Sequence, residues 1–430
     1  MINYSKFVLD NGLRVVVNED NSTPLVVVNV LYDVGARDED PDKTGFAHLF
    51  EHLMFGGSIH IPDYDSPLQI AGGENNAYTT NDITNYYCQL PAENIETAFW
   101  LESDRMLSLA FSRESLDVQK KVVSEEFKEN YINQPYGDVW SLLREMTFKV
   151  HPYKWMTIGK DLSHIEKAKL KDVKDFFFKH YTPSNAILSV AGNVTTEQVK
   201  ALAYKWFADI PAGPKYERHL PQEPDQTEKH FLEVKRKVPV DAFYKAWHGV
   251  AWNTPEYYSM DLLTDILGSG KSSRLFQSLV KEKKLFSNID CYHLGSVDAG
   301  LVVIEGKLAK GVSFEDAEAG VDMELEKVKE EKLTEKDLEK LKNRVESALA
   351  FEDTSLKSRA ADLAFFELRG DAGMINTVKD KYFAVTAEDI RAIGRKIFRE
   401  ENASVLWYRS EDASGLASEA ELETENERHD

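Results

Sequence analysis

The same order of expected elements occurs twice along this chain. Strands over residues 5–33 precede a helix that ends at Gly56 and Gly57. From Lys229 the pattern restarts, because "KHFLEVKRKVPVDAFYKAWHGVAW" repeats the strand pair and "PEYYSMDLLTDILGSGKSSRLFQSL" repeats the helix that ends in glycines. Strands and amphipathic helices in two similar runs predict an α+β fold made of two tandem copies of one unit.

Domain boundaries follow from this repeat. A chain of 430 residues exceeds one ordinary core, and two domains of roughly 200 residues are expected. We expect a first domain over residues 1–213, a linker over 214–229, a second domain over 230–412 and an acidic, mobile tail over 413–430. The linker is predicted because its stretch is rich in proline and charge and has no hydrophobic periodicity.

Composition and the ends of the chain exclude several classes of protein. A formal net charge of −21 leaves no basic stripe for phosphates, so we expect no nucleic-acid partner. Two cysteines, Cys88 and Cys291, lie in apolar runs and are expected in the core. No apolar run reaches the roughly 20 residues of a membrane span. The first residues do not resemble a signal peptide, so we expect a cytoplasmic protein, or a periplasmic one if a leader has been removed.

One short apolar stretch carries the chemistry: "GFAHLFEHLMFGG", residues 45–57. His48 and His52 are four residues apart, so on a helix they share one face with Cβ atoms roughly 6 Å apart. That spacing suits two imidazoles that bind one zinc ion at about 2 Å each. Apolar residues at helical spacing bury the other side of the helix. They are Phe46, Leu49, Phe50, Leu53 and Met54.

The glutamate between the histidines suits the role of a base. Glu51 is adjacent to His52 and three residues after His48. It can therefore lean over the ion without ligating it and accept a proton from water. The order His-x-x-Glu-His is the reversed zincin pattern of the inverzincins. The alternative is that the two histidines pack or cap without a metal.

A catalytic zinc also needs a third protein ligand and an open position for water. The helix "DVQKKVVSEEFKENY" offers the carboxylates Glu125, Glu126 and Glu129. Glu126 falls in one stripe with Val122, Val123 and Phe127 and is predicted to point inward. A buried carboxylate is costly unless it is paired or bound to metal, so Glu126 is the expected third ligand. A solvated acidic face fits Glu125 and Glu129 better than it fits Glu126.

Together these residues resemble the pitrilysin-type zinc metallopeptidases, a family that includes insulin-degrading enzymes and the mitochondrial processing peptidase. Glu126 follows His52 by 74 residues, which is similar to the family's spacing. The likeness covers nearly the whole chain, and its length is similar to that of half-length members such as the processing peptidase beta subunit and bacterial relatives. The matching stretches are "NGLRVVV", "NNAYTTNDIT", "KKVVSEEF", "PSNAILSVAGNV" and "LGSGKSSRLFQSLVKEKKLFS".

The resemblance implies two tandem homologous αβ-roll domains, each an antiparallel-rich sheet with helices packed on one face. It implies one Zn²⁺ per chain, held by His48, His52 and Glu126, with Glu51 as the catalytic base. It further implies a closed chamber, formed by a dimer, in which unfolded peptides or small proteins are hydrolysed.

The resemblance also implies a substrate-binding edge. A peptide would add as a β-strand beside Asn76, Ala77, Tyr78 and Thr79, through main-chain hydrogen bonds that carry little sequence preference. The alternative for this stretch alone is an ordinary edge strand.

Two departures from the family pattern concern supporting residues. Gln119 stands seven residues before Glu126, where many relatives carry a supporting glutamate. Lys281 and Asn288 stand where active relatives use an arginine and a tyrosine to hold substrate. Lysine lacks the bidentate fork of arginine, and asparagine is shorter than tyrosine. This leaves open a homodimer or a heterodimer with a zinc-less homologous subunit.

Three functions remain to be compared. The expected one is a zinc-dependent metalloendopeptidase. The alternatives are a non-catalytic, core-type structural subunit and a subunit that binds peptides without cutting them. The intact His-x-x-Glu-His motif favours the first, since structural subunits of this fold usually have broken zinc motifs.

Overall fold

The computed structural model describes residues 1–214, 216–252 and 254–411, so the predicted tail over 413–430 lies outside the described residues. The chain forms two compact units, each assembled from segments that are far apart in the sequence. Unit 1 comprises Met1–Glu129, His151–Pro221 and Glu346–Asp380. Among the described residues, unit 2 comprises Asn130–Val150, Gln222–Val345 and 381–411.

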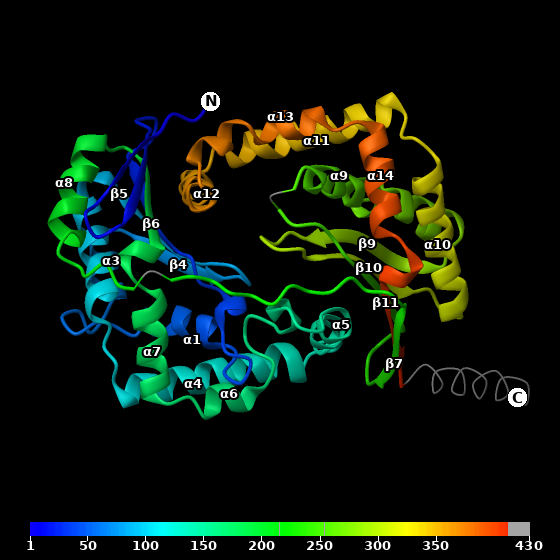
Figure 1. Cartoon of the computed structure of the whole chain (residues 1–430), viewed down its shortest axis with the longest axis horizontal. Helices are drawn as coiled ribbons and strands as arrows, with labels where there is room; N and C mark the ends of the chain where they lie inside the picture. The colour runs from blue at the N-terminus through cyan, green and yellow to red at the C-terminus, as the bar shows by residue number, and fades with distance from the viewer. Residues whose placement is uncertain (215, 253, 412–430) are drawn as a thin grey trace, which may run out of the picture. The chain divides into compact units, whose positions relative to one another are not determined.

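Unit 1 contains a six-stranded sheet in the order β1-β2-β6-β3-β5-β4 (Figure 1). The pair β2 and β6 is parallel, and all other neighbours are antiparallel. Runs of Val, Ile and Leu form its centre, as expected of buried strands. The strands are β1 Ser5–Val8, β2 Arg14–Glu19, β3 Leu25–Tyr32, β4 Glu74–Thr79, β5 Thr84–Pro91 and β6 Ala186–Gly192.

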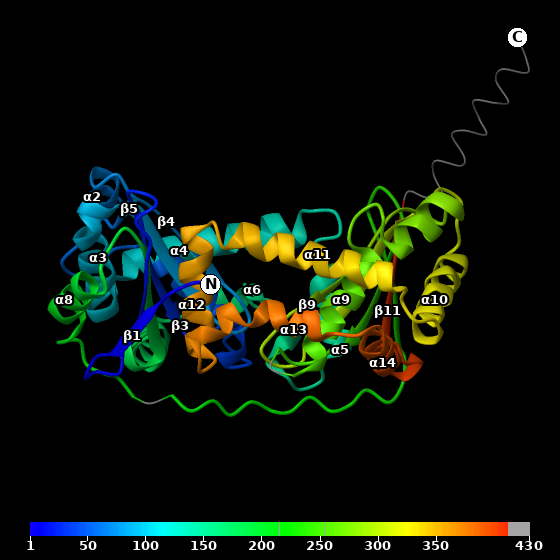
Figure 2. The ribbon, with the colours of Figure 1, turned by 90° about the horizontal axis from the view of Figure 1, so that it is seen from above.

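Helices cover both faces of this sheet, and not one face as expected. Figures 1 and 2 show α3 and α8 on one side of the strands and α12 on the other. Leu363 and Ala364 of α12 are fully buried against Val16, Leu31 and Ile187 of the sheet. The helices are α1 Phe46–Leu53, α2 Asp65–Ile70, α3 Ile95–Ser108, α4 Arg113–Phe127, α6 Leu162–Glu166, α7 Leu170–His180, α8 Thr196–Phe207 and α12 Leu356–Leu368.

Unit 2 contains a five-stranded sheet in the order β7-β11-β8-β10-β9. Its parallel pair, β7 and β11, is again followed by antiparallel neighbours. This order matches β2-β6-β3-β5-β4 of the first sheet, which confirms the predicted α+β fold with two similar sheets. The strands are β7 His230–Arg236, β8 Ala242–His248, β9 Phe286–Leu294, β10 Leu301–Leu308 and β11 Ala403–Ser410.

The helices of unit 2 are α5 Val139–Thr147, α9 Glu256–Gly268, α10 Phe314–Glu330 and α14 Ala387–Ile397. Two further helices, α11 Glu335–Glu352 and α13 Val378–Ala384, each belong partly to unit 1 and partly to unit 2. α10 and α11 are separate helices, because Thr334 caps α11: its hydroxyl accepts from Asp337 N at 3.1 Å. Within the described part of the chain, no helix is both long and apolar enough for a membrane crossing.

The strands of each sheet come from one of the two predicted domains. Two segments do not follow these domains: residues 130–150, from the first, belong to unit 2, and residues 346–380, from the second, belong to unit 1. The boundaries of homologous domains stay a prediction, since these units are defined by contacts. The predicted linker begins against unit 1. Arg218 donates to Asp38 Oδ1 at 2.7 Å and to Asp33 Oδ1 at 3.0 Å, and its side chain is mostly buried.

Candidate metal centre

The helix α1 carries the His-x-x-Glu-His motif and begins directly after Gly45. Gly45 has φ 86°, and a Cβ there would lie 2.5 Å from Ile158 O, so this turn requires glycine. The apolar side of α1 is buried as predicted, and the Phe50 ring packs on Phe176 and Tyr181 with centroids 5.3 and 5.0 Å away.

A buried carboxyl group caps the N-terminus of α1. Glu39 is 6% exposed, and its two oxygens accept from Gly45 N and Ala47 N, both at 2.9 Å. Trp155 Nε1 donates to the same side chain at 3.1 Å. Because Gly45 has no side chain that could cap the helix, Glu39 satisfies these N–H groups and thereby sets where the motif helix begins.

The three predicted ligands converge in unit 1. His48 and His52 present their Nε2 atoms to opposite oxygens of Glu126, at 3.6 Å from Oε1 and 3.4 Å from Oε2. The ligand atoms of all three residues lie within 4.8 Å of one another. The i, i+4 spacing on α1 and the packing of α1 against α4 bring them together.

This arrangement fits a zinc ion. Two ligands of a tetrahedral ion at about 2.0–2.1 Å are roughly 3.4 Å apart, which is close to both separations between histidine and carboxylate. Burial lowers the pKa of His48, so its imidazole is neutral near pH 7. His52 beside Glu126 holds the pKa of that carboxyl below its ordinary value. Neutral imidazoles and an ionised carboxylate are the forms that bind metal.

Glu51 lies on the same helix but has a different partner. Thr79 Oγ1 donates to Glu51 Oε2 at 2.6 Å. Glu51 is therefore held by the last residue of β4 and is free of the three ligand side chains, which suits a base rather than a ligand.

Two family descriptions match consecutive parts of the chain. "Insulinase (Peptidase family M16)" matches residues 14–160, and "Peptidase M16 inactive domain" matches residues 167–345. The chain belongs to peptidase family M16. All four motif residues lie in the first match, and the match called inactive begins after them. The predicted resemblance to insulin-degrading and processing peptidases is thus confirmed.

Individual M16 relatives match most or about half of the chain. The zinc protease PqqE of Helicobacter pylori is 27% identical over 411 residues, covering 93% of this chain and 91% of that protein. The mitochondrial-processing peptidase subunit beta of Saccharomyces cerevisiae is 28% identical over 259 residues, covering 58% and 55%. A crystal structure of a Helicobacter pylori protease aligns with TM-score 0.89 and 26% identity, covering 95% of this chain and 100% of that one.

On α4, the predicted inward stripe is partly wrong. Val122 is 45% exposed, because the side of α4 that carries it faces solvent rather than α1. Glu125 is exposed and pairs with Lys128 at 2.8 Å, and Glu129 is exposed as well, in agreement with a solvated acidic face. Gln119 is half-buried, and its role beside Glu126 stays a prediction.

The predicted substrate residues of this M16 chain lie in two places. β4 is the last strand of the first sheet, and it alternates Asn76 and Tyr78 with Ala77 and Thr79 on its two faces. Lys281 and Asn288 are exposed side chains of unit 2, at the end of a π-helical turn (Phe276–Glu282) and on β9. The role of Lys281 and Asn288 in substrate binding stays a prediction.

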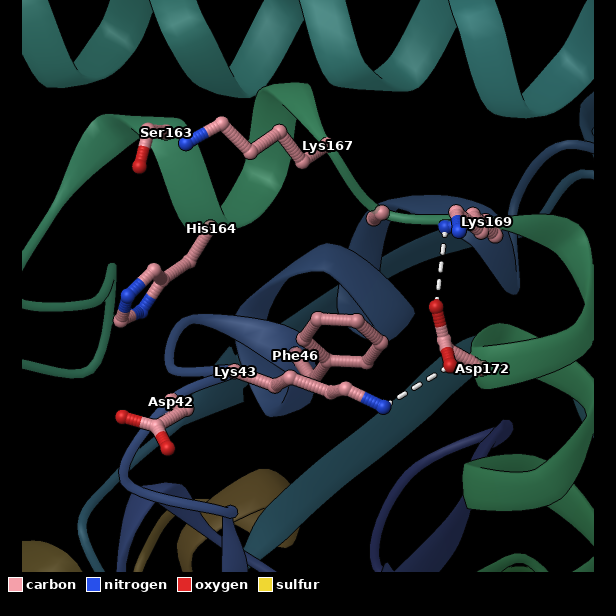
Figure 3. Close-up of a pocket in the computed structure, with 9 residues that line it drawn as sticks. Asp42, Lys43, Phe46, Ser163, His164, Lys167, Lys169 and Asp172 are labelled. Carbon is pink, nitrogen blue, oxygen red and sulfur yellow. Dashed lines mark hydrogen bonds and ion pairs between the residues drawn. The ribbon is translucent and has the colours of Figure 1, made fainter.

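A separate cavity of about 380 Å³ opens near the start of α1 (Figure 3). Lys43 pairs with Asp172 at 2.9 Å beside the Phe46 ring, and His164 lies across the opening. The motif residues do not line this cavity, so its lysines belong to another surface of unit 1.

Sequence reasoning missed Glu39 and gave Thr79 only a substrate-binding role. Because Gly45 precedes the motif helix and has no side chain that could cap it, the sequence indicated that the cap must come from elsewhere in the chain. The bond from Thr79 to Glu51 has no local signal, because it joins residues 28 positions apart.

Proposed function

We propose that this M16 chain is a zinc metalloendopeptidase that hydrolyses unfolded peptides or small proteins. The observation that carries the proposal is the convergence of His48, His52 and Glu126, with ligand atoms within 4.8 Å of one another. The names of two relatives, a zinc protease and a mitochondrial-processing peptidase subunit, support the same activity.

His48, His52 and Glu126 would hold the ion. When bound, zinc supplies a Lewis acid that polarises the peptide carbonyl and makes water easier to deprotonate. Glu51 accepts a proton from the attacking water and delivers it to the amine nitrogen as the C–N bond breaks. The substrate strand adds to β4 beside Asn76–Thr79, which aligns it through main-chain hydrogen bonds.

The active assembly in this proposal is a dimer that encloses the substrate. Lys281 and Asn288 in place of an arginine and a tyrosine favour a partner that supplies the missing pair, a zinc-less homologous subunit. Hydrolysis assays of the isolated chain test this point. Full activity of a homodimer contradicts the heterodimer.

Glu51→Gln tests the division of roles. We expect it to keep the metal and to lower kcat by about 10²–10⁴-fold, because the base is removed and the ligands remain. His48→Ala and Glu126→Ala should lose the metal as well as the activity. Elemental analysis and hydrolysis of a fluorogenic unfolded peptide, with and without a chelator, measure both quantities.

Glu125→Gln is the matched control, because this exposed neighbour of Glu126 pairs with Lys128 and should leave metal and turnover unchanged. A purified chain that binds zinc and peptide without cutting it would favour the peptide-binding subunit. A chain that binds no zinc would favour the structural subunit. Loss of zinc from Glu51→Gln would contradict its assignment as the base.

A further inference from the structure

The carboxylate of Glu51 is held at one of its two oxygens. Thr79 Oγ1 donates to Oε2 at 2.6 Å, a short distance for a hydroxyl donor. Among the described residues, no other hydrogen bond reaches this carboxylate. Oε1 is therefore left with its lone pairs available.

The donor stands on a rigid strand end. Thr79 pairs with Thr84 in the register of β4 and β5. The turn that follows is closed by Thr80, whose N–H donates to Ile83 O at 2.8 Å and whose Oγ1 accepts from Ile83 N at 3.0 Å. A β-branched side chain has few χ1 rotamers, so the hydroxyl is fixed once the backbone is.

The acceptor stands on a rigid helix. Leu49, Phe50 and Leu53 surround Glu51 along α1 and are buried. Strand alternation places Thr79 on the face of β4 that meets α1, whereas Asn76 and Tyr78 point to the opposite face. The hydrogen bond thus joins α1 and β4, and each of these elements is held in place by its packing in unit 1.

We propose that Thr79 is a positioning residue that fixes the Glu51 carboxylate for proton transfer, an inference that rests on the proposed function. With Oε2 occupied, Oε1 takes the proton. An O–H bond of the attacking water breaks as Oε1–H forms, and the water oxygen bonds to the carbonyl carbon while the π electrons of the C=O bond move to the carbonyl oxygen, from which they return when the C–N bond breaks. The proton then moves from Oε1 to the amide nitrogen, which receives the electron pair of the breaking C–N bond.

Because Thr79 ends the strand expected to bind the substrate, the same strand also aligns the base. Peptide binding on β4 and proton transfer at Glu51 therefore share one support.

Thr79→Val and Thr79→Ser test the proposal in the full-length protein loaded with zinc. Valine keeps the shape and removes the hydroxyl, so we expect kcat to fall by about 10–100-fold with KM and zinc content unchanged. Serine keeps the donor and should restore kcat to within about threefold of the original. The control is Thr84→Val, which removes the opposite hydroxyl, a donor to Val34 O at 2.9 Å, and should leave kcat unchanged.

A Thr79→Val enzyme with unchanged kcat, or a Thr79→Ser enzyme as slow as Thr79→Val, would overturn the positioning role. Crystal structures of the metal-free original and Thr79→Val proteins give a readout that is independent of activity. We expect one Glu51 conformation in the first and several in the second. If the original protein hydrolyses no peptide, the proposed function fails, while these structures still decide whether Thr79 orients Glu51; identical Glu51 conformations would overturn that.

Discussion

Single residues of unit 1 show how its core tolerates charge. Glu102 is fully buried and Arg105 is 2% exposed. The guanidinium donates from Nε to Oε2 at 3.0 Å and from Nη2 to Oε1 at 2.6 Å. It also lies over the Tyr64 and Tyr86 rings, 4.6 and 4.5 Å from their centroids. Two of the three guanidinium nitrogens bond the carboxylate while Nη1 has no hydrogen-bond partner among the described residues, so the ion pair itself holds both buried charges and is costly to break singly.

Arg105→Met should therefore lower the free energy of unfolding by about 3–5 kcal/mol, because it leaves the Glu102 carboxylate buried without a cationic partner, with only the Tyr64 hydroxyl and the Cys88 thiol donating to it. The double variant Glu102→Met with Arg105→Met should lose less than Arg105→Met alone. Urea unfolding followed by circular dichroism measures both. Losses that simply add would contradict a coupled pair.

At the scale of elements, the start of α1 depends on Glu39. Burial raises the pKa of Glu39 from 4.5 to about 8, although hydrogen bonds from Ala47 and Gly45 pull it down. The unfolded chain therefore ionises first as pH rises. The stabilisation from this carboxyl is full below pH 4.5 and is lost as pH rises through about 8.

Glu39→Gln should destabilise the protein by about 1–3 kcal/mol at pH 5, because both oxygens accept N–H bonds and an amide nitrogen would face a donor. Glutamine does not ionise, so the difference between the two proteins should shrink as pH approaches 8. Thermal unfolding from pH 5 to 8 measures this slope. A difference that grows with pH would contradict the raised pKa.

At the scale of the whole molecule, one segment completes unit 1 from the far end of the sequence. α12 buries Ala360 against Val27 and Ala191 of the first sheet. Arg359 pairs with Asp20, and Lys6 pairs with Glu367 at 3.2 Å. Without α12, one apolar face of this sheet would meet water.

A fragment of residues 1–221 should consequently aggregate or unfold, and the same fragment joined to residues 346–380 by a flexible linker should fold cooperatively. Size-exclusion chromatography and thermal unfolding measure the outcome. A joined fragment that carries Leu363→Asp is the control and should behave like 1–221. A monomeric, cooperatively folded 1–221 would contradict the need for α12.

The sequence by itself determined the features that repeat within a few residues. Helical periodicity places His48, Glu51 and His52 together. The predicted helix end at Gly56 and Gly57 is slightly too late, because α1 ends at Leu53 with Met54 as its C-cap. Glu126 was predicted as the third ligand because a carboxylate among apolar neighbours is costly to bury without a partner, although one of those neighbours, Val122, faces solvent.

Only the tertiary structure decided the contacts between residues that are distant in the chain. The bond from Thr79 to Glu51, the cap from Glu39 and the packing of α12 have no periodic signature, because each depends on where separate elements meet. Periodicity indicates which face of an element is buried, but it does not indicate which other element packs against that face. The residues of the candidate metal centre could thus be predicted from local patterns, whereas their convergence and their support depend on the fold.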